Sequence, residues 1–384
     1  MHKFICILSV SFFLYACGQE SQPGHSEINH QKNDEAQKDI SFEFNDFLSK
    51  NKELNKTVEV VFDKLATSQR VAQLIMPAIG EYGQKEKVID ELVNEKRIGG
   101  LLLLNGTKSQ FKDWVDKYDA LNENLNNPPF LYSADAEPSL INRKIKNTSA
   151  IPKANTLTSK KEVEAVAQKI SDELKMIGVN YNFAPVVDVA PNKTVGWRGF
   201  GHEPDSLIPW SSRFIEVTQS NKIIATAKHF PGHGNVVGDT HEKLVYIDGD
   251  MTELENYVPL ISEGVYSIMI AHIAIKNNPF YETQGMPATT SKKIVSDLLR
   301  DSLSFDGLIV TDAMNMGGVK KVENADVLAV KAGCDIVLMP LDARVTHEKL
   351  LELYETNDEM ARRIDEAAKR IVRMKICLGW DPLK

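Results

Sequence analysis

The chain has 384 residues, of which 42% are hydrophobic and 26% are charged, and its net charge is −8. This composition excludes a disordered chain, and the length suits one large α/β barrel domain. The mild acidity and the lack of a Lys/Arg-rich run give no electrostatic basis for nucleic-acid binding, so we expect a small-molecule or glycan partner.

The first forty residues are predicted to lie outside the folded domain. Residues 1–16 carry Lys3 and then an apolar stretch too short to span a membrane as a mature helix, which is typical of an export signal. Their end, Leu14-Tyr15-Ala16-Cys17, resembles a bacterial lipobox and implies a lipid on Cys17. Residues 17–40 are polar and are predicted to form a flexible tether. We therefore expect a membrane-anchored lipoprotein of the cell envelope; the alternative is an ordinary signal peptide with a chance cysteine.

Residues 41–384 are predicted to form one catalytic domain, in which short apolar runs alternate with amphipathic stretches. The clearest helix is expected between Ser159 and Gly178, with Ser159 and Glu162 as a capping box. The apolar runs are predicted to be buried parallel strands. They are Ile98–Leu104, Pro129–Ser133, Tyr181–Val189, Ile223–Ala227, Ser267–Ile275, Gly307–Thr311 and Asp335–Met339. Seven such runs favour a (β/α)8 TIM-type barrel with one irregular or missing strand over a doubly wound sheet, whose G-x-G-x-x-G fingerprint is missing.

Polar residues follow several of these runs at their carboxyl ends, where a barrel places its active site. They are Asp135, Asp188, Lys228, His229, His272 and Asp312. Asp312 follows an apolar strand in GLIVTD, so its carboxylate is suited to act as a nucleophile or a base. The alternative for Asp312 is an N-cap of the helix that follows a strand in a barrel.

The segment KHFPGHG, residues 228–234, is followed closely by Asp239-Thr240-His241. Lys228 and His229 at a strand end offer donors to substrate hydroxyls, and the proline with its flanking glycines fixes a tight turn. If the segment from Asp239 to His241 is extended, both side chains point the same way, and the carboxylate can orient the imidazole as a general acid/base. The alternative for this pair is a solvated polar loop.

A metal site is a further alternative for this histidine-rich segment. The spacing of His229, His233, Asp239 and His241 matches no zinc motif, and Lys228 would repel a cation. We therefore expect no metal and no cofactor.

Taken together, KHFPGHG, DTH and GLIVTDAMNM resemble glycoside hydrolase family 3, specifically the single-domain β-N-acetylhexosaminidases that act on peptidoglycan fragments. The segments GVNYNFAPVVDV and RGFGHEP fall in the family's order, so the resemblance covers nearly the whole mature chain. The resemblance implies that Asp312 is the nucleophile of a retaining reaction, that His241 is the acid/base and that Asp239 is its partner.

The same resemblance implies which residues bind the sugar. Lys228, His229 and Arg198 correspond to a sugar clamp, and Asp135 and Arg143 to further substrate-binding residues. The chain departs from the family after Asp135-Ala136-Glu137, where Pro138-Ser139 replaces a glycine turn by a restricted one. It also lacks the proline that is common after the DTH motif.

Three functions are consistent with these residues. The first is a retaining exo-β-N-acetylglucosaminidase that trims peptidoglycan-derived saccharides at the cell envelope. The second is a β-N-acetylglucosaminide phosphorylase, because a histidine acid/base does not repel an anionic acceptor. The third is a non-catalytic saccharide-binding lipoprotein on the same barrel, which the altered DAEPSL segment motivates. The sequence does not specify the oligomeric state.

Overall fold

The computed structural model describes residues 41–189, 192, 195–201 and 204–381. The predicted export signal, the tether and Cys17 lie outside the described residues. Residues from Ser41 onward cluster as one compact unit. Among the described residues, no helix combines the length and the apolar character needed to cross a membrane.

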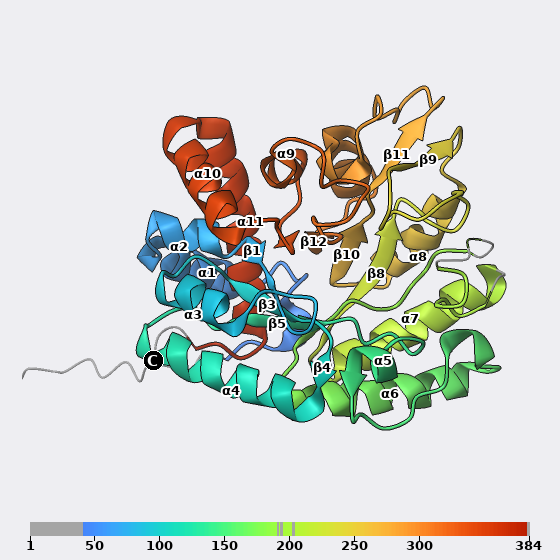
Figure 1. Ribbon diagram of the computed structural model, residues 1–384, viewed down its shortest axis with the longest axis horizontal. Helices are drawn as coiled ribbons and strands as arrows, with labels where there is room; N and C mark the ends of the chain where they lie inside the picture. Colours follow the sequence, from blue (N-terminus) through green and yellow to red (C-terminus); the bar gives the residue numbers. More distant parts are fainter. Residues whose placement is uncertain (1–40, 190–191, 193–194, 202–203, 382–384) are drawn as a thin grey trace, which may run out of the picture. The chain divides into compact units, whose positions relative to one another are not determined.

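Parallel strands form the centre of this unit, with helices around them (Figure 1). The seven strands of the main sheet lie in the order β12 (Leu308–Thr311), β10 (Ser267–Ile270), β8 (Ile224–Phe230), β7 (Tyr181–Asn182), β5 (Leu131–Ala134), β3 (Gly100–Leu103) and β2 (Ala78–Ile79). Every pairing in this sheet is parallel. All residues of these strands are buried, which explains why six of them, all but β2, fall in runs that the sequence shows as largely continuous apolar stretches rather than alternating ones.

The predicted barrel is confirmed in part. The fold is α/β with a parallel sheet, but the described strands do not form one continuous eight-stranded sheet. Strand β1 (Ile75–Met76) pairs instead with β13 (Val337–Leu338). Pro77 separates β1 from β2, and proline has no N–H with which to continue a ladder. Strands β1 and β2, which Pro77 separates, are the strand that could not be placed from the sequence.

One predicted strand is divided in the structure, and short strands that were not predicted pair outside the main sheet. The run Ser267–Ile275 is split at His272 into β10 and β11 (Ile273–Lys276), and β11 pairs with β9 (Val245–Asp248) outside the main sheet. In Figure 1 this pair lies to one side of the central strands. A short pair, β4 (Gly106–Thr107) with β6 (Ile145–Lys146), also lies outside the sheet.

Helices cover the sheet. They are α1 (Lys52–Lys64), α2 (Thr67–Ala72), α3 (Glu86–Asn94), α4 (Lys108–Asn124), α5 (Ile141–Lys144), α6 (Lys160–Ile177), α7 (Pro204–Ser220), α8 (Tyr257–Ser262), α9 (Ala325–Ala332), α10 (Ala343–Thr356) and α11 (Asp358–Cys377). A π-helical segment, η5 (Lys293–Ser302), and four short 3₁₀ turns complete the described elements: η1 (Phe44–Asp46), η2 (Ala154–Thr156), η3 (Thr252–Asn256) and η4 (Ala288–Thr290).

Helix α6 is the helix predicted from the sequence. The Ser159 hydroxyl accepts the Glu162 amide N–H at 3.3 Å, and Gly178 ends the helix with a φ of +93°. The capping box is only half correct, because the Glu162 carboxylate accepts from the Thr158 amide, 2.7 Å away, rather than from Ser159.

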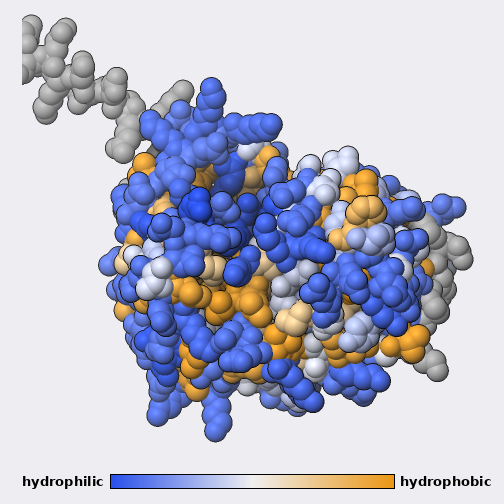
Figure 2. Space-filling view, turned by 90° about the horizontal axis from the view of Figure 1, so that it is seen from above, coloured by the Kyte–Doolittle hydropathy of each residue, from blue (hydrophilic) through white to orange (hydrophobic). Residues whose placement is uncertain are grey.

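The surface seen in Figure 2 is mostly hydrophilic, with hydrophobic residues in small, scattered groups. One large cluster of buried apolar side chains, contributed by the sheet and by helices such as α1, α4, α6 and α11, forms the core. The apolar core thus supports the strands from below, and the polar residues identified in the sequence gather at the carboxyl ends of the strands.

Candidate active site

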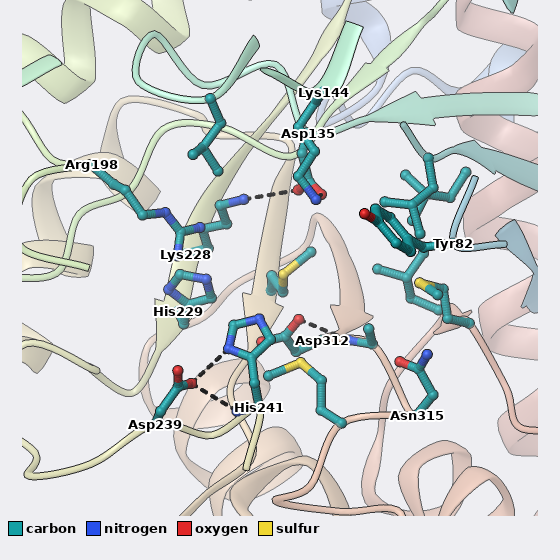
Figure 3. Close-up of a pocket in the computed structure, with 18 of the residues that line it drawn as sticks. Tyr82, Asp135, Lys144, Arg198, Lys228, His229, Asp239, His241, Asp312 and Asn315 are labelled. Atoms are coloured by element: carbon teal, nitrogen blue, oxygen red, sulfur yellow. Dashed lines mark hydrogen bonds and ion pairs between the residues drawn. The ribbon is translucent and has the colours of Figure 1, made fainter. Parts of the chain in front are cut away.

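The carboxyl ends of the strands surround a cavity of about 460 Å³ (Figure 3). Its lining includes all eight residues proposed from the sequence as catalytic or sugar-binding: Asp135, Arg143, Arg198, Lys228, His229, Asp239, His241 and Asp312. The structure thus brings together side chains that lie up to 177 positions apart, from Asp135 to Asp312. Their individual roles stay predictions.

Asp312 follows β12 directly, and its backbone N–H donates to the Ile270 carbonyl at 2.9 Å, which fixes it at the end of the strand. Its carboxylate accepts the Ala313 N–H at 2.8 Å. In the described part of the chain the next helix, α9, begins only at Ala325, so Asp312 is not the helix cap that was the alternative.

The charge state of Asp312 suits a nucleophile. Burial raises its pKa, but His229, His272 and the Ala313 N–H outweigh burial and hold the pKa below its usual value. His272 itself is buried, with one ring nitrogen 2.7 Å from the Thr289 hydroxyl and the other 3.0 Å from the Ala313 carbonyl oxygen. Asp312 is therefore ionised at neutral pH. Its carboxylate is fixed by the Ala313 N–H, and the neighbouring His272 ring is fixed by Thr289 and the Ala313 carbonyl.

Asp239 and His241 form the expected pair, although by a different geometry. The Asp239 carboxylate oxygen lies 2.6 Å from His241 Nδ1 and 2.9 Å from the His241 backbone nitrogen. One oxygen that accepts from the residue two positions ahead makes an Asx turn, so the predicted extended segment is wrong here. The consequence for chemistry is the same, because Nδ1 carries the proton that Asp239 accepts and Nε2 is left for a substrate.

The pair stands at the rim of the cavity. The His241 side chain is 62% exposed. Burial raises the pKa of Asp239, but the backbone and side-chain hydrogen bonds from His241 outweigh burial and lower it. Figure 3 shows His241 between Asp239 and Asp312. The imidazole that Asp239 holds therefore faces the cavity that contains Asp312.

Lys228 and Arg198 are anchored by a residue that the sequence analysis did not identify, Glu137. Lys228 Nζ lies 2.6 Å from a Glu137 oxygen, and Arg198 binds both oxygens of the same carboxylate at 2.9 and 2.6 Å. Lys228 Nζ also contacts Asp135 at 3.2 Å. An ammonium has three N–H donors, and two of them are used here, so one remains for a substrate hydroxyl.

Charge compensation explains why these groups stay ionised although they are buried. Burial raises the pKa of Glu137, but Arg198 and Lys228 outweigh it and lower the pKa to about 2. Burial lowers the pKa of Lys228, but Glu137 and Asp135 outweigh it and raise the pKa. Glu137 is therefore a positioning residue that holds both cations of the predicted sugar clamp.

Lys228 and His229 are consecutive, yet both line the cavity. The pairing of β8 with β10 matches Met269 to Lys228 and Ile270 to Phe230, so His229 is an additional residue in β8. Such a bulge redirects side chains. The peptide bond between Lys228 and His229 is cis.

His229 is also held by a carboxylate. Its Nδ1 lies 2.6 Å from the Asp188 carboxylate, and burial and the nearby Arg198 charge lower its pKa to about 3. A neutral ring donates its Nδ1–H to Asp188 and leaves Nε2 as an acceptor for a substrate hydroxyl. The place of His229 in the sugar clamp stays a prediction.

A second carboxylate that the sequence did not reveal, Glu253, fixes the glycine-rich loop. Glu253 accepts backbone N–H groups of Val189 at 2.5 Å, Gly234 at 2.8 Å and Asn235 at 3.3 Å. A Cβ on Gly232 would lie 2.5 Å from the Glu253 Cβ, and a Cβ on Gly234 would lie 1.7 Å from the Val189 carbonyl oxygen. The two glycines of PGHG are therefore required by close packing.

His233 has a structural position, and its ring contacts a side chain of the neighbouring motif. Its Nε2 lies 3.1 Å from the Thr240 hydroxyl, so it ties the glycine-rich loop to the DTH motif. Within the described residues, no group of three or more His, Cys, Asp or Glu side chains is arranged to hold a metal ion.

The departure at Pro138-Ser139 leaves the cavity lining intact. The Ser139 hydroxyl donates to the Trp197 carbonyl at 3.0 Å and accepts the Ala154 N–H at 3.0 Å. The hydroxyl thereby joins the segment after Asp135 to the segment that carries Arg198. Asp135 and Arg143 still line the cavity.

Comparison with known protein families identifies the family to which the chain belongs. The family model described as the glycosyl hydrolase family 3 N-terminal domain matches residues 66–374. A β-hexosaminidase of Hydrogenovibrio crunogenus is 27% identical over 292 residues, which cover 70% of this chain and 78% of that protein. A β-hexosaminidase A of Pseudoalteromonas piscicida is 31% identical over 238 residues, which cover 55% of this chain but only 40% of that protein.

Solved structures agree with these matches. A family 3 β-N-acetylglucosaminidase from Paenibacillus sp. aligns with a TM-score of 0.74 at 25% identity, covering 83% of this chain and 64% of that one. A β-N-acetylhexosaminidase from Beutenbergia cavernae aligns with a TM-score of 0.72 at 26% identity, covering 81% of this chain and 99% of that one. The chain thus spans less than two thirds of the Pseudoalteromonas and Paenibacillus proteins and nearly all of the Beutenbergia protein.

Proposed function

Because this chain belongs to glycosyl hydrolase family 3, and is therefore a glycoside hydrolase, we propose that it is a retaining exo-β-N-acetylglucosaminidase. The observation that carries the proposal is the 2.6 Å contact between Asp239 and His241 Nδ1, at the rim of the cavity that also holds Asp312. The relatives named β-hexosaminidase and β-N-acetylglucosaminidase support a 2-acetamido sugar as the substrate.

In the first step, the Asp312 carboxylate attacks C1 of the terminal sugar and forms an ester. The C1–O bond to the leaving group breaks, and the leaving oxygen takes a proton from His241 Nε2. Before this transfer the imidazolium is stabilised by Asp239. The buried charges of Lys228 and Arg198, held by Glu137, fix the sugar hydroxyls while positive charge develops at C1.

In the second step, the now neutral His241 removes a proton from water, and the water oxygen attacks C1. The ester bond breaks, Asp312 leaves as a carboxylate, and His241 regains its proton. Two displacements at C1 give net retention of configuration.

A phosphorylase remains the second candidate because of one feature of the site. After the first step His241 is neutral, so it does not repel a phosphate as a carboxylate base would. Analysis of products in phosphate buffer separates the two reactions: hydrolysis gives free N-acetylglucosamine, and phosphorolysis gives the sugar 1-phosphate.

We also propose that the natural substrates are peptidoglycan fragments, which the resemblance of KHFPGHG and DTH to peptidoglycan-recycling enzymes supports. Release of N-acetylglucosamine from a purified muropeptide, compared with its release from chitin oligosaccharides of the same length, tests the source. A clear preference for the chitin oligosaccharides would contradict it.

The strand arrangement is proposed to be an irregular (β/α)8 barrel. Backbone hydrogen bonds from Thr311 to Ile336 at 3.0 Å and from Val337 to Leu74 at 2.8 Å support this, because they connect β13 to the neighbourhood of both β12 and β1. An experimental structure that leaves β13 unpaired with either neighbour would contradict it.

A leaving-group series tests the mechanism. We expect His241→Ala to retain the first step with a dinitrophenyl leaving group, which departs without a proton, and to lose ~10²–10⁴-fold with an alkyl or sugar leaving group. The second step also needs His241, so the glycosyl-enzyme should accumulate and produce a burst. Asp312→Asn should abolish turnover of every substrate, because no leaving group replaces a nucleophile. An equal loss for both leaving groups in His241→Ala would leave the acid/base unassigned.

A further inference from the structure

We propose that Tyr82, Asn315 and the Pro340–Leu341 turn form a binding site for the second sugar of the substrate, on the leaving-group side of the cavity. The proposal rests on the function proposed above, since it concerns what lies beside the sugar that reacts. It assigns a role to an exposed aromatic residue that the mechanism does not use.

Tyr82 stands on a rigid turn after β2. The turn is closed by hydrogen bonds from the Gly83 N–H to the Gly80 carbonyl at 3.1 Å and from the Gln84 N–H to the Ala78 carbonyl at 2.7 Å. Gly80 has a φ of +135°, and a Cβ there would lie 1.9 Å from the Leu104 carbonyl oxygen. Tyr82 is nevertheless 67% exposed. An exposed ring on a fixed turn is preorganised, so binding to it costs little ordering of the backbone.

A second cavity continues from the first at Tyr82. It has a volume of about 170 Å³ and shares Tyr82, Asn315 and Met339 with the larger cavity. Its remaining lining is Pro77, Ala78, Gly83, Gln84, Pro340 and Leu341. In Figure 3, Tyr82 lies across the larger cavity from Lys228 and His229, and Asn315 lies below Tyr82 on the same side of the view. A substrate longer than one sugar can therefore extend from the clamp toward Tyr82 and into the second cavity.

The chemistry changes across the cavity. The clamp side carries Glu137, Lys228 and Arg198, whereas the residues that line the second cavity carry no formal charge. Asn315 is exposed, and its amide forms no hydrogen bond to the part of the chain that the structure describes. An aromatic ring, apolar walls and one free amide fit a pyranose, which offers a C–H face for stacking and hydroxyls for hydrogen bonds.

The position also fits the direction in which a leaving group departs. Asp312 lies within the cavity, and His241, which protonates the leaving oxygen, lies at the exposed rim. The sugar attached to that oxygen must then lie toward the rim, where Tyr82 is the large exposed aromatic side chain of the lining. The occupant is thus the second pyranose of a disaccharide or of the non-reducing end of an oligosaccharide.

The test compares two leaving groups. kcat/KM is measured with N,N′-diacetylchitobiose, whose leaving group is a sugar, and with N-acetylglucosaminyl fluoride, whose leaving group cannot stack. In Tyr82→Ala, the ratio of kcat/KM for the disaccharide to that for the fluoride should fall about 10-fold, because stacking and apolar burial at one ring are lost. Tyr82→Phe should retain most of the ratio. Phe280→Ala is the matched control, since Phe280 is 74% exposed and lies outside both cavities, and it should leave the ratio unchanged.

An unchanged ratio in Tyr82→Ala would overturn the proposal, while turnover of both substrates would leave the proposed function intact. If the wild type turned over neither substrate, the proposed function would fail, and binding would decide the inference instead. Calorimetry on the Asp312→Asn protein, with and without Tyr82→Ala, should then show about a 10-fold weaker Kd for the disaccharide and a much smaller change for N-acetylglucosamine. Equal changes for the two ligands would overturn it.

Discussion

Glu137 determines whether the two cations of the site stay in place. It is fully buried and binds Lys228 at 2.6 Å and Arg198 through both oxygens. In Glu137→Gln the amide keeps the shape but removes the carboxylate that pairs with both buried cations. We expect a loss of about 3–5 kcal/mol of unfolding free energy, measured by chemical denaturation, together with a lower kcat/KM.

The matched control is Glu173→Gln. Glu173 is also buried and pairs with Lys108 at 2.6 Å, but it belongs to α6 and does not line the cavity. This variant should lose stability and keep kcat/KM. If both variants lost kcat/KM to the same extent, Glu137 would have no specific role in the site.

The pH dependence of stability gives a separate test of Glu137. Its pKa falls from 4.5 to about 2 in the folded protein, which means that the ionised form is favoured by folding. The stability it contributes is complete above pH 4.5 and is lost as the pH falls through about 2. The difference in unfolding free energy between the wild type and Glu137→Gln should therefore be constant above pH 4.5 and decrease below it. A difference that grows on acidification would contradict the assigned charge state.

The residues that could be predicted from the sequence share one property, which is a position next to a recognisable strand or motif. Asp312 and Lys228 follow apolar runs, and the ends of parallel strands meet at one face. Glu137 and Glu253 could not be predicted, because their partners lie 61 to 91 and 18 to 64 positions away and nothing local indicates a buried carboxylate. The sequence also could not show the protonation of the His229 ring, since it depends on Asp188 and on burial.

At the scale of elements, the loop between β8 and β9 carries His241, the proposed acid/base, and packs closely against Glu253 and Val189. We expect Gly234→Ala to displace this loop, because the new Cβ would lie 1.7 Å from the Val189 carbonyl oxygen and 2.5 Å from a Glu253 carboxylate oxygen. Since a misplaced acid/base costs about 10²-fold, kcat/KM for a sugar leaving group should fall by that order.

Gly285→Ala is the control for a glycine substitution. Gly285 has a φ of +79° and open space around its Cβ, and it does not line the cavity. It should lose about 1 kcal/mol of stability and keep kcat/KM, measured with the same substrate. Full activity in Gly234→Ala would mean that the loop adapts and that its glycines are not required for catalysis.

The strands themselves were predictable where three of four residues are apolar, as in β12 and β10. The sequence failed where the backbone breaks the pattern. Pro77 divides the strand that opens the fold, and the apolar run Ser267–Ile275 continues through His272 although the chain leaves the sheet there. Apolar character records burial rather than pairing, so it cannot show where a ladder ends.

At the scale of the whole molecule, none of the described helices is long and apolar enough to cross a membrane. The prediction that the enzyme is nonetheless membrane-anchored depends on Leu14–Cys17, outside the described residues. Several acyl chains on one residue bind a bilayer stably, whereas a polar tether has little affinity of its own. We therefore expect Cys17→Ser to move the protein from the membrane fraction to the soluble fraction, while kcat/KM on a soluble aryl substrate stays unchanged, because the cavity lies wholly in the folded unit.

Cys6→Ser is the matched control: Cys6 belongs to the predicted signal and is removed with it, so this variant should fractionate like the wild type. A wild-type protein that is fully soluble and shows no lipid mass on Cys17 would contradict the anchor and leave the catalytic proposal untouched.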